Sequence, residues 1–496
     1  MTNTAVPTGT QAALDTDSTA AAPAAVSTGT STGTSTGTGI GIGPGAPPGA
    51  ARPGRRHQLD DWRPEDPAFW RTTGAPIARR NLIVSITSEH IGFSVWSLWS
   101  VMVLFLGPEY GIDPAGKFLL TAVPTALGSV LRLPYTLAVA RFGGRNWTIV
   151  SALLLLLPAV PMTILIEPGV SYGTLMVLAC LAGVGGGNFA SSMANINLFY
   201  PQRLKGWALG LNAGGGNIGV AAVQLVGLAV LATAGAAYPR LVPAVYLPLI
   251  VFAALASARY MDNIRGARNE KGAMREAARD PHTWIMSLLY IGTFGSFIGF
   301  GFAFGQVLQV QFKEQFATPI DAAYLTFLGP LVGSLIRPVG GWLADRFGGS
   351  RVTLVNFAAM AAGAGLVYFA SRERSLPLYL IGFIGLFVFS GIGNGSTYKM
   401  IPAIFRAKAT LAVNAGELDA AAAERRAWRL SGALIGIAGA VGAFGGVLVN
   451  IAFRQSFLTY QTADAAYLAF IAWYAICLAI TWVVYRRPSR HRLAGV

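Results

Sequence analysis

Charged residues are scarce in this chain: Asp, Glu, Lys and Arg make up 12% of its 496 residues. Soluble proteins carry roughly 25%, so the chain has too little polar surface to face water on every side. Apolar runs take the place of charge, with 53% hydrophobic residues and a mean hydropathy of +0.52. Many of the 60 glycines lie inside those runs, which is typical of closely packed membrane helices. The composition therefore predicts an all-α protein that crosses a membrane many times.

Residues that bind metals or form covalent intermediates are also scarce. The chain has two cysteines, Cys180 and Cys477, both in apolar segments, and four scattered histidines. No disulfide framework, CxxC metal site, nucleophile motif or nucleotide-binding loop can be identified. We therefore expect no enzyme activity, no metal and no cofactor. The net charge of +15 would suit nucleic acid, but the basic residues lie in short loops and form no continuous face, so we expect no such partner.

The chain begins with a stretch unlike the rest. Residues 1–60 are rich in Ala, Thr, Ser, Gly and Pro and have no continuous apolar core, so we expect a disordered tail and no signal peptide. Twelve apolar runs follow, each close to the roughly 20 residues that a bilayer span requires. The predicted spans are 82–106, 117–140, 147–166, 173–199, 206–233, 241–260, 283–312, 324–344, 352–370, 376–401, 430–452 and 467–485.

The spans divide into two groups of six on either side of a charged segment. Most of the 37 Lys and Arg residues fall in loops on one side, which is the cytoplasmic side by the positive-inside rule. We therefore expect both termini in the cytoplasm and the protein in the plasma membrane of a prokaryote. The predicted parts are an N-terminal half at 61–260, a cytoplasmic segment at 261–282, a C-terminal half at 283–487 and a C-terminal tail at 488–496.

An internal repeat relates the two halves. Residues 127–150 and 332–355 share nine identities in 24 positions at a constant offset of 205, and Arg132 of the first copy matches Arg337 of the second. Each arginine lies eight or nine residues before the cytoplasmic end of its helix. At 1.5 Å per residue that is about 12–14 Å into a hydrocarbon core of about 30 Å. The repeat therefore places both arginines near the middle of the membrane, in opposite halves.

An arginine at that depth is energetically costly and usually functional. Neither span has a carboxylate within a helical turn of its arginine, which argues against a structural ion pair. A guanidinium group is a planar, permanently charged fork that suits planar oxyanions. We predict an anion site between Arg132 and Arg337, although two arginines alone would also suit phosphate or a carboxylate.

The organisation of the chain resembles a large class of transporters. The chain is similar to the major facilitator superfamily in three features. It has two groups of six spans, a long cytoplasmic segment between the groups, and the run Asp345-Arg346-Phe347-Gly348 after the eighth span. That resemblance implies alternating access, through rocking of two six-helix halves about one site. The first copy departs from the family's loop motif, because Ala140 stands where the acidic residue is expected.

Several longer segments resemble a narrower family. They are the glycine-rich runs 206–219 and 432–446, together with 61–70, 187–196 and 284–300. These segments look like those of the nitrate/nitrite porter family of the NarK type, and the likeness extends over about residues 61–487. It implies a substrate site made of Arg132, Arg337, Asn217, Tyr290, Phe93, Phe189 and Phe294.

The residue types in that set suit a small planar anion such as nitrate or nitrite. Phenylalanines above and below a flat anion exclude water and leave no room for a tetrahedral one, while Tyr290 and Asn217 each donate a hydrogen bond. Without the resemblance, the aromatic residues would be interpreted as ordinary packing. Lys399 lies near the cytoplasmic end of the tenth span and fits either interfacial snorkelling or a role in the exit path.

Glu89 and His90 in the first span depart from the apolar residues that the family pattern leads us to expect, and they share the helical face of Phe93. They form either a structural salt link or a proton-binding site. Two transport hypotheses stay open, nitrate/nitrite exchange and proton-coupled symport of nitrate or nitrite. An anion channel is a third, which the midplane arginines argue against because conduction needs weak, multi-site binding. We expect a monomer in the lipid bilayer.

Overall fold

The computed structural model describes residues 57–265, 272–316, 319–488, 493 and 496. This part of the chain is almost entirely helical. Its N-terminal half contains α1 (Pro67–Phe69), α2 (Ala75–Trp96), α3 (Trp99–Phe105), α4 (Pro114–Phe142), α5 (Gly144–Leu154), α6 (Leu156–Leu165), α7 (Tyr172–Ala182), α8 (Asn188–Phe199), α9 (Gln202–Ala234) and α10 (Leu241–Tyr260). Next come α11 (Ala273–Arg279) and the helices of the C-terminal half, α12 (Pro281–Tyr290), α13 (Ser296–Gln311), α14 (Pro319–Thr326), α15 (Leu328–Phe347), α16 (Gly349–Arg372), α17 (Leu376–Asn414), α18 (Ala420–Tyr460) and α19 (Asp464–Thr481).

Short π or 3₁₀ turns and two strands complete the secondary structure of the described residues. The strands β1 (Gln58–Leu59) and β2 (Asn263–Ile264) form one parallel pair. The turns are η1 (Trp70–Gly74), η2 (Pro108–Tyr110), η3 (Gly183–Gly187), η4 (Ile291–Gly295), η5 (Lys313–Gln315) and η6 (Trp482–Arg486).

Eleven helical stretches in the described chain are long and apolar enough to cross a membrane. They lie where the second to twelfth spans were predicted, which confirms a multi-pass helical protein. The predicted first span, 82–106, corresponds to α2 and α3, which follow each other with a break at Ser97 and Leu98. α2 alone has 22 residues, or about 33 Å at 1.5 Å per residue. It is less apolar than the others because its buried side chains include Asn81 and Glu89.

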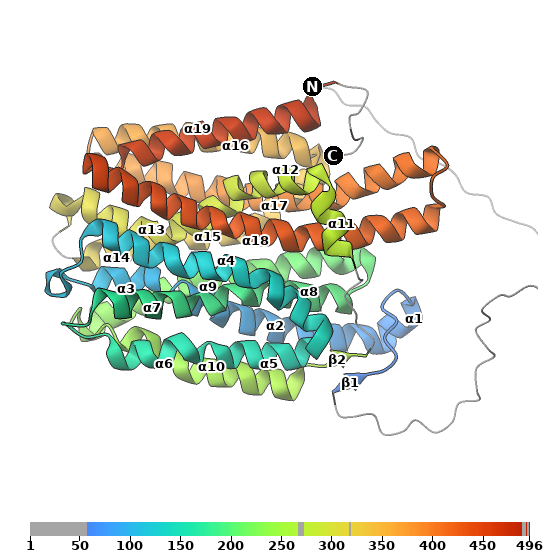
Figure 1. The fold of residues 1–496 in the computed structure, drawn as a ribbon, viewed down its shortest axis with the longest axis horizontal. Coiled ribbons are helices and arrows are strands. Elements are labelled where there is room, and N and C mark those ends of the chain that lie inside the picture. Colours follow the sequence, from blue (N-terminus) through green and yellow to red (C-terminus); the bar gives the residue numbers. More distant parts are fainter. Residues whose placement is uncertain (1–56, 266–271, 317–318, 489–492, 494–495) are drawn as a thin grey trace, which may run out of the picture. The chain divides into compact units, whose positions relative to one another are not determined.

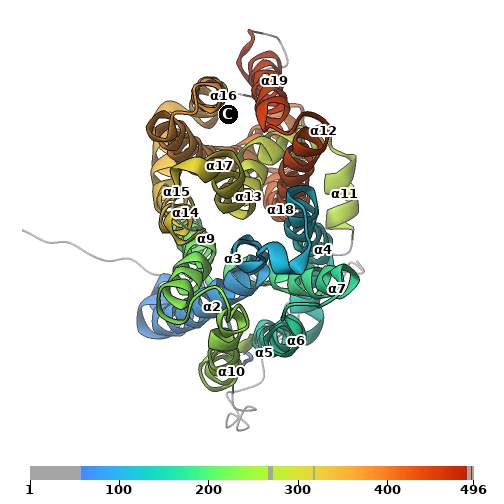
Figure 2. The ribbon, with the colours of Figure 1, turned by 90° about the vertical axis from the view of Figure 1, so that its left-hand side faces the viewer.

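The long helices run roughly along one direction (Figure 1). Viewed along that direction, α2 to α10 form one group and α12 to α19 form the other (Figure 2). The two halves meet where α4 packs on α18 and where α9 packs on α15. The helices α4 and α15 that carry the repeated arginines therefore both lie at the interface between the halves.

The repeat that relates α4 to α15 is visible in their backbone. α4 ends at Gly143 with φ 87° and ψ 146°, and α15 ends at Gly348 with φ 90° and ψ 135°. Only glycine adopts this positive φ readily, so the same residue ends the same helix in each half. In both halves a new helix starts at the next residue, as α5 and α16.

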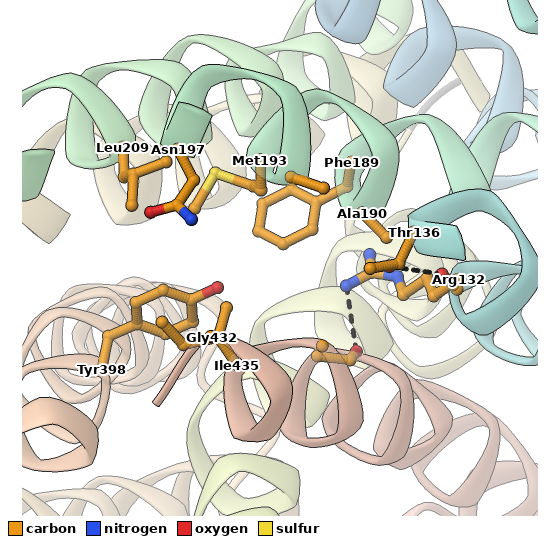
Figure 3. Close-up of a pocket in the computed structure, with 13 residues that line it drawn as sticks. Arg132, Thr136, Phe189, Ala190, Met193, Asn197, Leu209, Tyr398, Gly432 and Ile435 are labelled. Atoms are coloured by element: carbon orange, nitrogen blue, oxygen red, sulfur yellow. Dashed lines mark hydrogen bonds between the residues drawn. The ribbon is translucent and has the colours of Figure 1, made fainter. Parts of the chain in front are cut away.

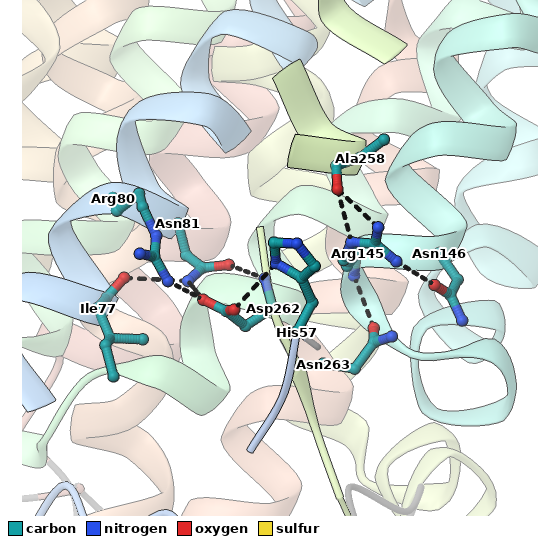
Figure 4. Close-up of polar contacts among 9 residues, drawn as sticks. All are labelled: His57, Ile77, Arg80, Asn81, Arg145, Asn146, Ala258, Asp262 and Asn263. Carbon is teal, nitrogen blue, oxygen red and sulfur yellow. Dashed lines mark hydrogen bonds and ion pairs between the residues drawn. The ribbon is translucent and has the colours of Figure 1, made fainter. Parts of the chain in front are cut away.

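The predicted N-terminal tail, 1–60, falls mostly outside the described residues. Its last residues belong to the folded part, since β1 at Gln58–Leu59 pairs with β2 at Asn263–Ile264. Next to β2, the carboxylate of Asp262 accepts hydrogen bonds from Arg80 at 2.5 Å and from Asn81 at 2.9 Å (Figure 4). The start of the first span is thereby tied to the end of the sixth.

The segment before the first span packs on the end of α8. The indole nitrogen of Trp62 donates to the Leu198 carbonyl at 3.1 Å. Asp66 caps α1 by accepting from the backbone nitrogens of Ala68 and Phe69, and these bonds hold the pKa of its carboxyl below the usual range. Residues 61–70 are thus an ordered cap on the N-terminal half.

The segment between the predicted tenth and eleventh spans is helical in most of its length. α17 continues to Asn414 and α18 begins at Ala420, so residues 415–419 alone interrupt the helices. Figure 1 shows this pair extending well past the ends of the neighbouring helices. The predicted C-terminal tail, 488–496, lies largely outside the described residues, but the carbonyl of Val496 accepts a hydrogen bond from Ser350.

Candidate functional site

Arg132 lies in the middle of α4 and is fully buried, with 0% of its surface exposed. Its Nη1 donates to the Gly439 carbonyl of α18 at 3.0 Å, which crosses the interface between the halves. Its Nε and Nη2 have no hydrogen-bond partner among the described residues. The guanidinium group therefore has two donors available for a ligand.

Arg337 occupies the equivalent place in α15 and is 5% exposed. Its Nη2 donates to the hydroxyl of Tyr290 at 3.2 Å, and its Nη1 has no partner in the described part of the chain. Neither Arg337 nor Arg132 forms a salt bridge there. Two buried cations without paired anions cost several kcal/mol each, so a bound anion would offset a substantial penalty.

Aromatic rings connect the two arginines. The guanidinium carbon of Arg132 lies 4.7 Å from the ring centre of Phe189 and 5.0 Å from that of Phe294. Phe294 in turn stacks on Tyr290, with ring centres 5.1 Å apart and planes 9° from parallel. Because Tyr290 bonds to Arg337, a continuous layer of side chains runs from one arginine to the other. Phe93 packs edge-to-face with Phe189, with ring centres 5.8 Å apart.

The residues in this layer come from helices that glycines allow to approach closely. A Cβ at Gly442 of α18 would lie 2.4 Å from the ring of Tyr290, and one at Gly445 would lie 2.8 Å from the Cα of Gly295. Only glycine leaves room for the Tyr290 ring between α12 and α18. These two glycines of the run 432–446 therefore shape the site because they have no side chain.

A cavity of about 60 Å³ adjoins Arg132 and separates the halves (Figure 3). A water molecule needs about 10–15 Å³ of such volume, so the space suits a few small molecules or an ion of a few heavy atoms. Figure 3 shows α8 side chains on one wall, facing Tyr398 and residues of α18 on the other. The lining residues are Arg132, Thr136, Phe189, Ala190, Met193, Ala194, Asn197, Leu209, Tyr398, Gly432, Ile435, Gly436 and Gly439.

The cavity leads from Arg132 toward the membrane side on which α4 ends and α9 and α18 begin. On the opposite side the halves are in tight contact. Phe118 of α4 stacks on Phe453 and Phe457 of α18, at 5.6 and 5.5 Å, and Thr121 donates to the Asn450 side chain at 2.8 Å. The structure is thus closed on that side. Further contacts there are Gln306 to Pro114, Gln224 to Gly301 and Trp96 to Phe302.

Glu89 is buried near the arginines, with 1% of its surface exposed. Its Oε2 accepts from the amide of Asn212 at 2.7 Å, and the same amide nitrogen lies 2.7 Å from the Ser192 hydroxyl. Its Oε1 packs against Gly216, where a Cβ would lie 2.2 Å away, and has no hydrogen-bond partner among described residues. The carboxyl is close enough to Arg132 and Arg337 to interact electrostatically with both.

Two predicted residues lie apart from this layer in the described geometry. His90 points to α9, where its Nδ1 lies 3.2 Å from the Gly215 carbonyl. Asn217 is fully buried in α9, and neither atom of its amide has a partner in the described chain. It shares a helical face with Val220 and Gln224, which contact Gly301 of the other half. Asn217 therefore faces the interface without lining the cavity.

Sequence reasoning missed two aromatic residues of the site. Tyr398 lines the cavity, its ring centre lies 5.4 Å from the Arg337 guanidinium, and its buried hydroxyl has no described partner. The ring centre of Trp96 lies 5.4 Å from the Arg132 guanidinium. Neighbouring Lys399 does not reach the cavity lining and instead pairs with Asp345 at 2.8 Å. The signal for Tyr398 was its place one residue before that intramembrane lysine.

Comparison with known proteins adds to this geometry. Residues 90–418 match the Major Facilitator Superfamily. The chain is 37% identical to the nitrate/nitrite transporter NarU of Salmonella typhimurium, covering 88% of this chain and 98% of that protein. It is 32% identical to the probable nitrate/nitrite antiporter NarK2 of Thermus thermophilus, over the same shares. These relatives are transporters, which confirms that the chain is not an enzyme.

Solved structures support the same fold. An inward-facing, occupied bacterial homolog of the lysosomal transporter Spinster aligns with a TM-score of 0.60 at 16% identity, covering 82% of this chain and 97% of that one. A partially occluded, inward-open form of the xylose transporter XylE from E. coli aligns with a TM-score of 0.60 at 12% identity, covering 82% and 98%. Together with the close sequence relatives, this places the chain in the major facilitator superfamily and, within it, in the nitrate/nitrite porter family.

Proposed function

We propose that this protein carries nitrate and nitrite across the membrane by alternating access, exchanging one for the other. The observation that supports this most is the pair of buried arginines, Arg132 and Arg337. They come from equivalent helices in opposite halves, and each has N–H donors without a partner in the described chain. An anion that bonds to both would link the two halves at their interface.

The surroundings of the pair favour a small planar anion. Phe189 and Phe294 present ring faces beside the Arg132 guanidinium, and stacked Tyr290 carries the hydroxyl that bonds to Arg337. Flat walls admit a trigonal ion edge-on, whereas a tetrahedral ion would have to displace a ring. The relatives named as nitrate/nitrite transporters agree with this substrate class.

We propose that the side on which the cavity lies is the cytoplasm, because most Lys and Arg residues are in the loops of that side. Both termini then lie inside the cell, and the structure represents the inward-facing state. In the outward-facing state the Phe118–Phe453 stack would separate, and α9 and α18 would approach each other. Transport by a monomer is sufficient for this cycle, since one chain supplies both arginines.

The test is uptake of labelled nitrate into proteoliposomes that contain nitrite, chloride or buffer alone. Exchange predicts fast uptake with nitrite inside and little with chloride or buffer. Equal rates in the three preparations would indicate a channel and would overturn the proposal.

A second candidate, proton-coupled symport, is favoured by one observation, the burial of Glu89 within electrostatic range of both arginines. A charged Glu89 lowers the attraction of the arginines for an anion, and a protonated Glu89 does not. One proton would then travel with each nitrate. Asn212 holds the carboxyl in place in either state.

The decisive variant is Glu89→Gln, which keeps the shape of the side chain and removes the titration. Symport predicts that an inward proton gradient drives nitrate accumulation into liposomes containing buffer alone, and that Glu89→Gln abolishes this while nitrate/nitrite counterflow survives. His90→Gln is the matched control, because His90 faces Gly215 rather than the Asn212 network. Accumulation that ignores the gradient in the wild-type protein would leave exchange as the mechanism.

A further inference from the structure

A second cavity lies on the outer surface of the N-terminal half, away from the transport site. It has a volume of about 660 Å³ and lies between the start of α2 and the end of α10. Three of its lining residues are arginines, and the others are apolar or aromatic. The lining consists of Arg71, Ala75, Pro76, Arg79, Arg80, Ile83, Val84 and Tyr260.

The positive charge of this cavity is only partly neutralised. Arg80 pairs with Asp262 at 2.5 Å, which fixes the direction of its guanidinium (Figure 4). Within the part of the chain that the structure describes, neither Arg71 nor Arg79 has a salt bridge or a side-chain hydrogen bond. All three arginines are exposed. The cavity therefore offers two cations without acidic partners beside a third that is already oriented.

The cavity lies at the boundary between membrane and water. Ile83, which lines it, is 54% exposed, as expected for a residue that faces lipid tails. Arg79 and Arg71 precede Ile83 by about 6 Å and 18 Å along the chain at 1.5 Å per residue. The headgroup region is about 5–8 Å deep on each side of a bilayer, so Arg79 lies at that level, and Arg71, which lines the same cavity, lies farther toward the water. Tyr260 completes the wall at the level where amphipathic aromatic side chains are enriched.

We propose that this cavity binds an anionic phospholipid of the leaflet on that side. The headgroup phosphate lies between Arg71, Arg79 and the oriented Arg80, and an acyl chain runs along the exposed side chain of Ile83. Charge complementarity and the adjoining apolar wall distinguish this ligand from a free phosphate ion, which would gain nothing from the apolar side. The proposal rests on the fold and does not depend on the identity of the transported anion.

The experiment is native mass spectrometry of the purified full-length protein in detergent, titrated with phosphatidylglycerol or phosphatidylcholine. We expect one phosphatidylglycerol to bind more tightly than phosphatidylcholine. Each arginine near a membrane surface contributes about fivefold to such binding, so Arg71→Gln with Arg79→Gln should weaken it by about 25-fold. Arg425→Gln is the matched control, because Arg425 is an exposed arginine at the start of α18 on the same side, outside this cavity.

A second variant tests the same cavity in case the double arginine variant does not fold. Pro76→Glu removes no arginine but adds a carboxylate to the cavity, at a helical position where Glu is a better helix former than Pro. It should also release phosphatidylglycerol. Undiminished binding in both variants, or equal binding of phosphatidylcholine, would overturn the proposal. So would displacement of the lipid by millimolar inorganic phosphate, which would identify a free-phosphate site instead.

Discussion

The two halves of the molecule share a framework but differ in what they place inside it. In the N-terminal half a Cβ at Gly186 would lie 2.6 Å from the Cα of Gly128, and in the C-terminal half one at Gly391 would lie 2.2 Å from the Gly333 carbonyl. These pairs match at the offset of 205, so the second and fourth helices of each half touch at the same point. The close backbone contact between the second and fourth spans is therefore repeated in both halves, although the surrounding side chains differ.

The repeat changes its offset where the secondary structure changes. Buried Asn188 and Asn394 match at 206 instead of 205, and the shift falls at the end of η3 (Gly183–Gly187), a 3₁₀ segment that α17 lacks. A 3₁₀ helix rises about 2.0 Å per residue against 1.5 Å in an α-helix. The larger rise acts in the direction of the shift, since it lets the N-terminal half cover the same depth with fewer residues.

The contents of the halves differ most around the proposed substrate site. The C-terminal half supplies stacked Tyr290 and Phe294, whereas the N-terminal half supplies the carboxyl of Glu89 held by Asn212. Both halves supply ring faces beside Arg132, Phe189 from the N-terminal half and Phe294 from the C-terminal half, whereas the buried carboxyl comes from the N-terminal half.

The largest effect should come from breaking the symmetric pair. Arg132→Lys and Arg337→Lys keep the charge but lose the planar fork, and each should abolish nitrate transport. The lost charge-assisted hydrogen bonds correspond to about 1.5–3 kcal/mol of binding free energy. Nitrate binding and counterflow measure this. Near wild-type transport by either correctly inserted variant would show that the two arginines do not share one substrate.

The shared glycine contacts should respond alike in the two halves. Gly186→Ala and Gly391→Ala each force a methyl group into backbone atoms, which should lower the free energy of unfolding by about 1–3 kcal/mol. Gly385→Ala is the matched control, since a Cβ there meets nothing within 4 Å. Thermal unfolding in detergent is the measurement. A control as unstable as the other two would contradict the packing argument.

The aromatic rings should set selectivity. Phe294→Ala and Phe189→Ala each remove a cation–π contact with Arg132, worth about 0.5–2 kcal/mol, and open space beside it. Nitrate should bind more weakly and sulfate, phosphate and chlorate should compete better. Phe252→Ala serves as a control, because Phe252 is 58% exposed on α10. Unchanged competition profiles in both site variants would mean that the rings do not limit the substrate's shape.

The smallest effect concerns the loop motif, which the halves do not share. Asp345 pairs with Lys399 in the C-terminal half, whereas Ala140 occupies the corresponding position in the N-terminal half. Both partners of the pair are at least 40% exposed, so Asp345→Asn should cost less than about 1 kcal/mol. Thermal unfolding and the counterflow rate should barely change. A large loss would show that the pair holds the inward-facing state.

The sequence predicted the elements that composition and charge define. The apolar runs located the spans, and the arginines stood out because charge inside such a run is rare. Trp96 and Tyr398 could not be found this way, since the chain has 11 tryptophans and 16 tyrosines and only tertiary packing selects which ones meet an arginine. The face that Asn217 presents was likewise undetermined, because hydropathy fixes depth but not rotation about the helix axis.

The break at Ser97 and Leu98 was also invisible in the sequence, as no proline or glycine lies there. The Ser97 hydroxyl donates to the Phe93 carbonyl, and the Ser100 hydroxyl donates to the Ser97 carbonyl. These side-chain bonds compete with the regular hydrogen bonds of the helix backbone. Hydropathy alone predicts one continuous span here. Competition between serine hydroxyls and backbone N–H groups for the same carbonyls can be recognised only when the hydrogen-bond partners of those carbonyls are known.

The helices α17 and α18 are long enough that, in the proposed rocking cycle, a small rotation of the C-terminal half would displace their outer ends by a larger distance. With 39 and 41 residues, they measure about 58 and 62 Å at 1.5 Å per residue, about twice the thickness of a hydrocarbon core. Both helices belong to the C-terminal half, so their protruding ends would move with that half. Spin labels at Glu417, near the tip of this helix pair, and at Arg141, at the end of α4, would report each rocking step as an amplified change in distance, measured entirely outside the bilayer.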